Sequence, residues 1–506
     1  MSRLSRRRFV ATGIAGVGAI ALPPFVTGAQ AATVVRSNVA SPAGLAMLKK
    51  YAQAVKLMKA RPHGDPLSWQ FQWYTHAVPS NTTKPAQLLA VYGPNPSPQK
   101  ALASLMWNTC QAHFNPANEP FFLPWHRMFV CFFEHIIRKV LNDQTFALPY
   151  WDYSVPAGFA IPAQFRMPND PLFGPLFQAN RRSVVNAGQP IFSGIGAASD
   201  LSPAGALGQT QYLPSGAIPG FNQQLDQNLH GNVHVFVGGP QNMGQVPFAA
   251  QDPIFWMHHC NIDRLWVVWN QTHPNPGTAA YLNKSFVFAN ESGQQANAIV
   301  KDYTTTTKCG YRYDNPAGPG PAIAARPSAM AATVAAAVPP GPPTLVASAA
   351  NSGPVALGTA PARVPLRVTA PAPATPQDSP PAAGLAPLAA RVEALPQNRR
   401  IFVVLKDLSA AATPEALYRV YLDLPEGTPD DPINSHYLGS FTFFDASHGG
   451  DHGGASKPYS FDATTVIANL QERAVLKPEH TITIVPSGQP SDDAKPVVGD
   501  ISIVEQ

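Results

Sequence analysis

The sequence predicts a mainly α-helical N-terminal domain, a four-helix bundle with long loops, followed by a C-terminal domain that is an all-β sandwich. Apolar residues recur at helical spacing through the first half of the chain, and short alternating runs typical of strands fill its end. A stretch rich in alanine and proline separates the two parts. We therefore expect a leader at residues 1–31, a helical domain at 32–315, a linker at 316–395 and a sandwich at 396–506.

The leader has the features of an export signal. Arg6, Arg7 and Arg8 precede an apolar run, and small residues at 29–31 provide a cleavage site after Ala31, as in twin-arginine signals. The alternative, a short membrane anchor, is less favoured because the apolar run is too brief to span a bilayer. We expect a periplasmic or secreted protein without a membrane anchor once the signal is removed.

Composition excludes several classes of protein. The formal net charge is +5, and the loss of four arginines with the leader leaves about +1. A nearly neutral chain without a basic stripe gives no reason to expect nucleic acid binding. The four cysteines are too few for a disulfide scaffold and allow one or two disulfides at most.

The helical domain is expected to contain several helices joined by long loops. Two segments rich in proline, asparagine and glycine, at residues 79–98 and 156–218, are expected to be irregular, and a long irregular region typically covers a functional face. Helices are predicted at residues 41–60, 66–76, 100–111 and 127–141, around 230–234, and at 258–270.

Histidines cluster in the later helices. His230 and His234 are four residues apart and therefore share one helix face, and the segment 252–266 adds His258 and His259. One such pair is weak evidence, because a histidine on an ordinary helix face is more common than a metal ligand.

A second histidine set earlier in the chain strengthens the metal hypothesis. It consists of His76, His113 and His126, the last within Phe-Phe-Leu-Pro-Trp-His-Arg at residues 121–127. Two sets of three imidazoles suggest two metal ions, and ligation by histidine alone fits copper. The Glu-x-x-His pattern of di-iron bundles is absent, because Glu134 and His135 are adjacent in the sequence.

These motifs resemble those of the type-3 copper family, which comprises tyrosinases, catechol oxidases (polyphenol oxidases) and molluscan haemocyanins. The resemblance runs from about Trp69 to Tyr313, and Tyr-Leu-Gly-Ser-Phe at 437–441 resembles a strand of the family's C-terminal β-sandwich. It implies two copper ions, the first held by His76, His113 and His126, and the second by His230, His234 and His259. His258 is then a neighbour that hydrogen-bonds outside the ligand set.

The resemblance also implies roles for residues that do not bind copper. Asp263 would orient a ligand imidazole or pair with an arginine such as Arg264. Asp226 and Gly231 occupy the positions where the family holds a water for phenol deprotonation with an acid and an asparagine. The sequence departs from the family pattern at Gly231, and also in the interval between His113 and His126, which is four residues longer than usual. Whether Cys110 forms a thioether, a disulfide or neither is left open.

The implied activity is oxidation of ortho-diphenols to ortho-quinones with O2 as co-substrate, with monophenol hydroxylation as a possible addition. Two alternatives remain: a haemocyanin-like protein that binds O2 without substrate turnover, and a structural zinc protein. Zinc is less favoured because structural zinc prefers four closed ligands.

The C-terminal sandwich is expected to cover the copper pocket and to keep the enzyme latent until the sandwich is removed. In the family such a domain inserts one side chain toward the substrate position. Phe441, Phe443 and Phe444 are the candidates, and in an unbroken strand Phe441 and Phe443 point to one side and Phe444 to the other.

Overall fold

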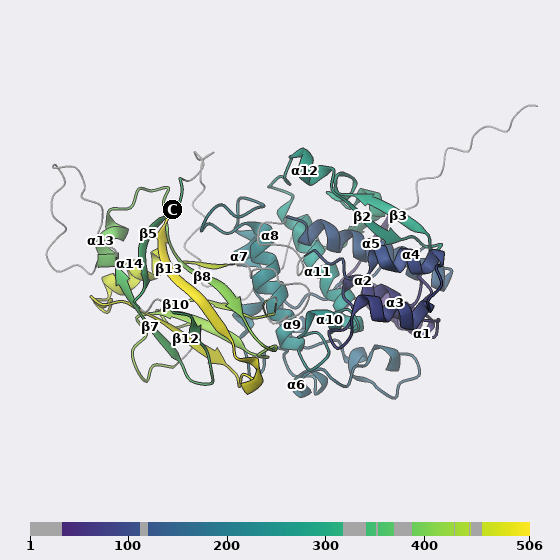
Figure 1. Cartoon of the computed structure of the whole chain (residues 1–506), viewed down its shortest axis with the longest axis horizontal. Coiled ribbons are helices and arrows are strands. Elements are labelled where there is room, and N and C mark those ends of the chain that lie inside the picture. Colours follow the sequence, from purple (N-terminus) through teal and green to yellow (C-terminus); the bar gives the residue numbers. More distant parts are fainter. Residues whose placement is uncertain are drawn as a thin grey trace, which may run out of the picture.

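The computed structural model describes residues 33–111, 120–316, 341–350, 353–368, 387–429, 431–444, 446 and 458–506. The expected leader, His113 and parts of the expected linker lie outside these residues. Within the described ranges, no helix is long and apolar enough to cross a membrane. The chain forms two domains with separate cores, a helical domain on the right of Figure 1 and a sheet domain on the left.

Two long helices form the centre of the helical domain, α5 (Phe122–Leu141) and α11 (Pro253–Trp269). They pack against each other and are buried along most of their lengths, and α1 (Pro42–Lys59) packs on α5. The expected mainly α architecture is confirmed. The remaining helices are α2 (Trp69–His76), α3 (Lys84–Tyr92), α4 (Pro98–Met106), α6 (Ser183–Asn186), α7 (Ala204–Leu207), α8 (Phe221–Gln224), α9 (Gly231–Val237), α10 (Val246–Ala249) and α12 (Ala279–Leu282).

The two central helices begin earlier than the sequence predicted. Helix α5 begins at Phe122 and not at residue 127, because Pro124 lies in the first turn, where a missing N–H breaks no helical hydrogen bond. Helix α11 begins at Pro253, with the side chain of Asp252 accepting from the N–H of Ile254 as the cap. His126, His258 and His259 therefore lie inside these two helices.

The loop expected at residues 79–98 is wrong, because α3 lies within it. Thr83 caps this helix and Pro85 stands in its first turn, and its apolar residues Leu88, Val91 and Tyr92 pack on the core while staying only partly buried. The prediction of irregular structure at 156–218 is confirmed. Its regular pieces are one-turn helices, namely α6, α7 and the 3₁₀ turns η1 (Pro156–Gly158), η2 (Ala163–Arg166), η3 (Gly174–Leu176) and η4 (Ala198–Leu201).

Two connections hold the end of the helical domain to its beginning. Strand β1 (Val34–Arg36) pairs in parallel with β4 (Tyr311–Tyr313), which brings the first described residues beside the last part of the domain. A disulfide joins Cys131 of α5 to Cys309 of η7 (Thr307–Cys309), and Cys110 takes no part in it. The other elements here are the hairpin of β2 (Ser285–Ala289) and β3 (Gln295–Ile299), and the turn η6 (Val300–Tyr303).

The sheet domain is built around one nine-stranded sheet in the described residues. Its two end strands, β10 and β11, contact each other, so the sheet nearly closes around its core. The expected all-β domain is confirmed, with two helices added, α13 (Pro387–Glu393) and α14 (Thr464–Glu472). Apart from the short β6 (Val355–Ala356), which pairs with β13, the strand order is β10 (Tyr437–Phe441), β9 (Leu417–Leu422), β12 (Thr481–Ser487), β7 (Ala362–Val368), β5 (Thr344–Ala349), β13 (Val497–Glu505), β8 (Ile401–Ser409) and β11 (Tyr459–Asp462).

The linker expected at 316–395 is wrong for residues 344–349, 355–356 and 362–368, which form three strands of this sheet, and for α13 at 387–393. The misleading signal was the composition of this stretch, which is rich in alanine and proline; one of its prolines, Pro365, lies in β7, although proline is rare in an interior strand. Here β7 pairs with β12 through residues 362–365 and with β5 through residues 366–368, so Pro365 lies where the pairing changes partner. Its carbonyl still accepts a hydrogen bond from the N–H of Ala350.

Candidate metal centre

The first histidine set lies where α2 meets α5. His76 is the last residue of α2 and His126 lies in the first half of α5, with ring centroids 5.9 Å apart and both side chains buried. The thiol of Cys110 completes this group, with its sulfur 3.6 Å from Nε2 of His126. His113, the third ligand implied by the family resemblance, lies outside the described residues.

The second set is larger than the sequence predicted. His230, His234, His258 and His259 each offer one nitrogen, and these nitrogens lie within 4.8 Å of one another. His230 ends a π-helical turn, η5 (Leu225–His230), which runs directly into α9. A π-helical turn is a local strain that is frequent at functional sites.

Three of the histidines are held in one tautomer by backbone carbonyls. Nδ1 of His126 bonds to the carbonyl of Phe122 at 2.8 Å, and Nδ1 of His234 bonds to that of Met243 at 2.8 Å. Nδ1 of His230 lies 3.0 Å from the carbonyl of Asp226. A carbonyl can only accept, so each Nδ1 carries the proton and each Nε2 presents a lone pair, as metal-ligating histidines do.

His258 and His259 have no hydrogen bond from either ring nitrogen in the described structure. Burial, with the neighbouring imidazoles adding to it, lowers the pKa of both groups well below the ordinary value of a histidine. Both rings are therefore neutral near pH 7. A buried, neutral imidazole without a hydrogen bond fits a metal ion as its missing partner.

The two adjacent histidines have different neighbours. His259 stacks on His126 of the first set, with centroids 4.3 Å apart and planes 7° apart, and it also faces His230. His258 stacks on His230 at 5.3 Å and faces Tyr153 at 5.4 Å. His259 therefore lies between the two sets, whereas His258 lies at the edge of the second.

Aromatic side chains surround the imidazoles. Phe255 lies 4.2 Å from the ring of His259 and 5.0 Å from that of His76, and Trp125 packs on His126 at 4.8 Å. These rings keep the metal centre dry and fix the imidazole orientations. They offer no ligand atoms.

Asp263 pairs with arginines, although not with Arg264 as the sequence analysis suggested. Its carboxylate accepts from Nε of Arg127 at 2.5 Å and from the hydroxyls of Tyr311 and Tyr313 at 2.5 and 2.6 Å. Burial alone would raise its pKa, but the nearby guanidinium charges outweigh burial and lower the pKa. Arg264 donates to Asp152 instead, because neighbouring positions on a helix point in different directions.

Asp226 and Gly231 flank His230. The carboxylate of Asp226 is buried and lies 3.2 Å from Nδ1 of His230, so this residue contacts the imidazole through both its side chain and its carbonyl. Gly231 is buried at the start of α9, directly after the histidine. A Cβ atom at position 231 would lie 3.3 Å from Oγ1 of Thr442, which belongs to the sheet domain.

The sheet domain lies directly over the second histidine set. Phe444 stacks on His234, with centroids 4.2 Å apart and planes 18° apart, and its edge faces His230 at 5.8 Å. Phe441 and Phe443 pack on Tyr418 inside the sheet domain. Of the three candidates Phe444 is the residue on the histidines, and Phe441 and Phe443 face the core of the sheet domain, although β10 ends at Phe441 and the unbroken strand that the prediction assumed is not present.

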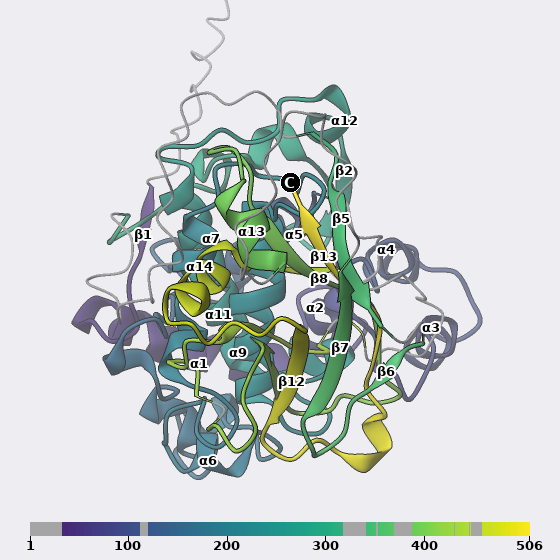
Figure 2. The same ribbon diagram turned by 90° about the vertical axis from the view of Figure 1, so that its left-hand side faces the viewer.

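Polar contacts surround this aromatic contact. Ser440 donates to the carboxylate of Asp200 at 3.3 Å, and Nε2 of Gln223 donates to the carbonyl of Pro458 at 3.0 Å. The hydroxyl of Tyr459 lies 3.4 Å from the carbonyl of Gln227 in η5. Figure 2 shows the sheet domain in front of the helical domain. These residues carry no sign of this role in the sequence, because contacts between domains leave no periodic signal.

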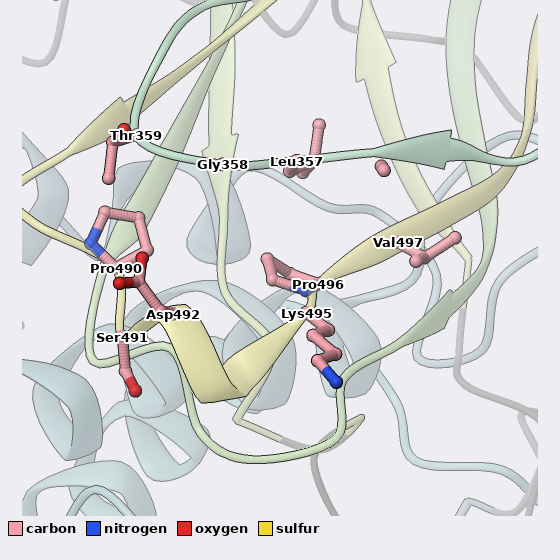
Figure 3. Close-up of a pocket in the computed structure, with 10 residues that line it drawn as sticks. Leu357, Gly358, Thr359, Pro490, Ser491, Asp492, Lys495, Pro496 and Val497 are labelled. Carbon is pink, nitrogen blue, oxygen red and sulfur yellow. The ribbon is translucent and has the colours of Figure 1, made fainter.

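A hollow elsewhere in the sheet domain does not belong to the site. It measures about 250 Å³ and lies between the segment after β6 and the turn before β13 (Figure 3). Its charged residues, Asp492 and Lys495, are exposed, and it contains no imidazole or thiol. We assign it no part in the chemistry.

Comparison with known proteins agrees with this geometry. The family description "common central domain of tyrosinase" matches residues 66–272, and a domain of unknown function, DUF7868, matches residues 344–506. Tyrosinase HcTyr1 of Hahella sp. (strain CCB-MM4) is 33% identical over 301 residues, which cover 53% of this chain and 60% of that protein. The chloroplastic polyphenol oxidase of Malus domestica is 28% identical over 293 residues, covering 53% and 46%. The chain thus spans about half the length of these curated relatives.

Solved structures show the same fold over nearly the whole chain. Latent apple tyrosinase superposes with a TM-score of 0.60 at 20% identity, covering 94% of this chain and 98% of that one. A latent aurone synthase superposes with a TM-score of 0.61 at 19% identity, covering 94% and 89%. The match to the tyrosinase central domain spans His76, His126 and the four histidines of the second set, so residues 66–272 are similar to the central domain of tyrosinases, which supports the type-3 copper family.

Proposed function

We propose that this protein is a dicopper phenol oxidase that uses O2 to oxidise ortho-diphenols to ortho-quinones. The observation that carries the proposal is the convergence of buried imidazoles in two adjoining sets, three of which, those of His126, His230 and His234, have Nδ1 bonded to a backbone carbonyl. Copper accepts such all-nitrogen ligation. Copper bound there would supply O2 binding and electron transfer, which imidazole side chains cannot supply.

The proposed ligands follow from the family resemblance and the contacts. His76, His113 and His126 would hold one copper ion, and His230, His234 and His259 would hold the other. The stacking of His259 on His126 supports its choice over His258, because a ligand of the second ion that also contacts the first set brings the two ions together. His258 would support His230 by stacking on it.

The protein's own groups would orient the substrate and accept its protons. Each ortho-diphenol gives two electrons and two protons, and the buried carboxylate of Asp226 beside His230 is the acidic group of η5 nearest the imidazoles. Gly231 has no side chain that could help to hold a water for deprotonating a monophenol. We therefore propose that diphenols are the preferred substrates and that monophenols are hydroxylated slowly.

The sheet domain would keep the enzyme latent. Phe444 occupies the space against His234 and His230 into which a phenol ring would have to enter. A haemocyanin-like protein that binds O2 without turnover would also need its histidines shielded from phenols. Removing the sheet domain distinguishes this alternative from a latent oxidase. We also propose export through the twin-arginine leader. Cleavage of the leader after Ala31 would give the exported protein a new N-terminus.

The oxidase proposal is tested on the copper-loaded chain after mild proteolysis has cut off the sheet domain, which is the cover over the histidines. We expect near-ultraviolet absorption that depends on O2 and disappears when a catechol is added, with quinone as the product. A matched monophenol should react slower by on the order of tenfold or more, a difference of about 1.4 kcal/mol in the barrier. O2-dependent absorption with no turnover after opening would instead identify an O2 carrier, and comparable rates on both phenols would contradict the role given to Gly231.

The choice between the adjacent histidines is tested by copper content. His259→Ala should lose copper after dialysis and lose all oxidation, because one of three ligands is missing. His258→Ala should weaken copper binding by about 10–100-fold at most, as the loss of a residue outside the ligand set does. Copper per chain, measured by elemental analysis, decides the matter, and the reverse pattern would show that His258 is the ligand.

Latency is tested by removing the ring that covers the histidines. Phe444→Ala in the full chain should raise diphenol oxidation per bound copper on the order of tenfold, because the closed state loses its central contact. Phe443→Ala is the matched control, since it removes the same ring from the core of the sheet domain without touching a histidine. Equal activation by both variants would mean that general loosening of the domain, and not Phe444, controls access.

A further inference from the structure

Gly231 is a glycine that the backbone does not require. Its angles, φ −58° and ψ −40°, are those of an ordinary right-handed helix, which every residue adopts. A glycine inside a helix costs about 1 kcal/mol relative to alanine. The reason for its presence must therefore lie in the space around it.

That space is filled from the other domain. The atom nearest to a Cβ at position 231 would be Oγ1 of Thr442, at 3.3 Å, followed by the carbonyl of Asp226 at 3.7 Å. The first distance is shorter than an ordinary van der Waals contact. Thr442 is buried and directly follows β10, two residues before Phe444.

Thr442 is held on both sides and cannot easily move aside. The hydroxyl of Tyr459 donates to its carbonyl at 3.1 Å, and the same hydroxyl reaches Gln227 of the helical domain. Oγ1 of Thr442 accepts from the N–H of Phe444 at 3.5 Å. A shift of Thr442 would therefore also shift the ring that lies on His234.

We propose that Gly231 is the docking position for the sheet domain, where the absence of a side chain lets Thr442 seat and Phe444 cover the histidines. A side chain at 231 pushes Thr442 away and opens the cover. This inference rests on the proposed function for its regulatory meaning, but the contact itself is independent of copper. The residue at position 231 then has two effects: it controls whether the sheet domain closes over the histidines, and it affects the preference for diphenols over monophenols.

The contact is tested by hydrogen exchange on the full, metal-free chain. We expect amide exchange in residues 440–444 to be faster in Gly231→Ala than in the unmodified chain, and faster still in Gly231→Asn. In Gly231→Asn the protection of these amides should fall on the order of tenfold. Unchanged exchange in α5 and α11 shows that each variant is folded. Gly205→Ala is the matched control, because Gly205 is an exposed helical glycine whose Cβ would meet nothing closer than 3.9 Å.

Rescue separates this contact from a general disturbance. Thr442→Ala removes Oγ1, so combining it with Gly231→Ala should restore the protection of residues 440–443; the N–H of Phe444 is left out of this comparison, because it donates to the oxygen that is removed. Wild-type exchange in Gly231→Asn, or no rescue in the double variant, would overturn the proposal. Both readings are made without copper, so a failure of the oxidase proposal would leave them unaffected, and a failure here would leave the oxidase proposal standing.

The substrate effect of position 231 can then be isolated. In a Phe444→Ala background the cover is already open, so Gly231→Asn should raise the ratio of monophenol to diphenol oxidation without further raising the diphenol rate. An increase of both rates in equal proportion would mean that residue 231 acts on closure alone.

Discussion

The carboxylate of Asp263 joins the two helices on which the metal centre depends. It lies one turn after His259 on α11 and bonds to Arg127, which follows His126 on α5. Arg36 of β1 approaches it at 3.5 Å, and Tyr311 and Tyr313 of β4 donate to it. Removing one partner from such a buried ion pair costs about 3–5 kcal/mol, because the other charge is left uncompensated. The stacked rings of His126 and His259 therefore have a fixed spacing before any metal binds.

The sheet domain forms a second layer over this rigid centre. The helical domain supplies the imidazoles, whereas the sheet domain supplies the ring on His234 and the hydroxyl above Gly231. The polar contacts around them involve single hydrogen bonds such as Ser440 to Asp200. Single bonds of this kind contribute about 1 kcal/mol each. The cover can thus be stable in the resting protein and still open without unfolding either domain.

The sequence was sufficient for the helical class, the all-β tail and most of the histidines, because those signals are periodic or chemically rare. The spacing of four residues between His230 and His234 is enough to predict that they share one helix face. The alternation of strand residues likewise predicted that Phe444 points away from Phe441 and Phe443. These inferences needed only local geometry.

Other features depend on contacts between distant segments and could not be read from the chain. Arg127 was not seen as the partner of Asp263, since nothing local relates residues separated by most of the domain. Strand β7 was taken for linker because the stretch around it is rich in alanine and proline. Pro365 fits in the strand because the pairing changes partner there, which the composition does not reveal. The contact between Thr442 and Gly231 could not be predicted, because it joins two domains whose relative placement the sequence does not give.

We propose that two copper ions lie between the two imidazole sets, and a single zinc ion is the competing arrangement. His230, His234, His258 and His259 could in principle close around a single zinc ion with four ligands. X-ray absorption of the metal-loaded chain distinguishes the two arrangements. We predict two copper ions per chain, each with about three nitrogen neighbours, separated by about 3.5–4 Å. A single zinc ion with four imidazole neighbours, and no metal near His76 and His126, would contradict the account.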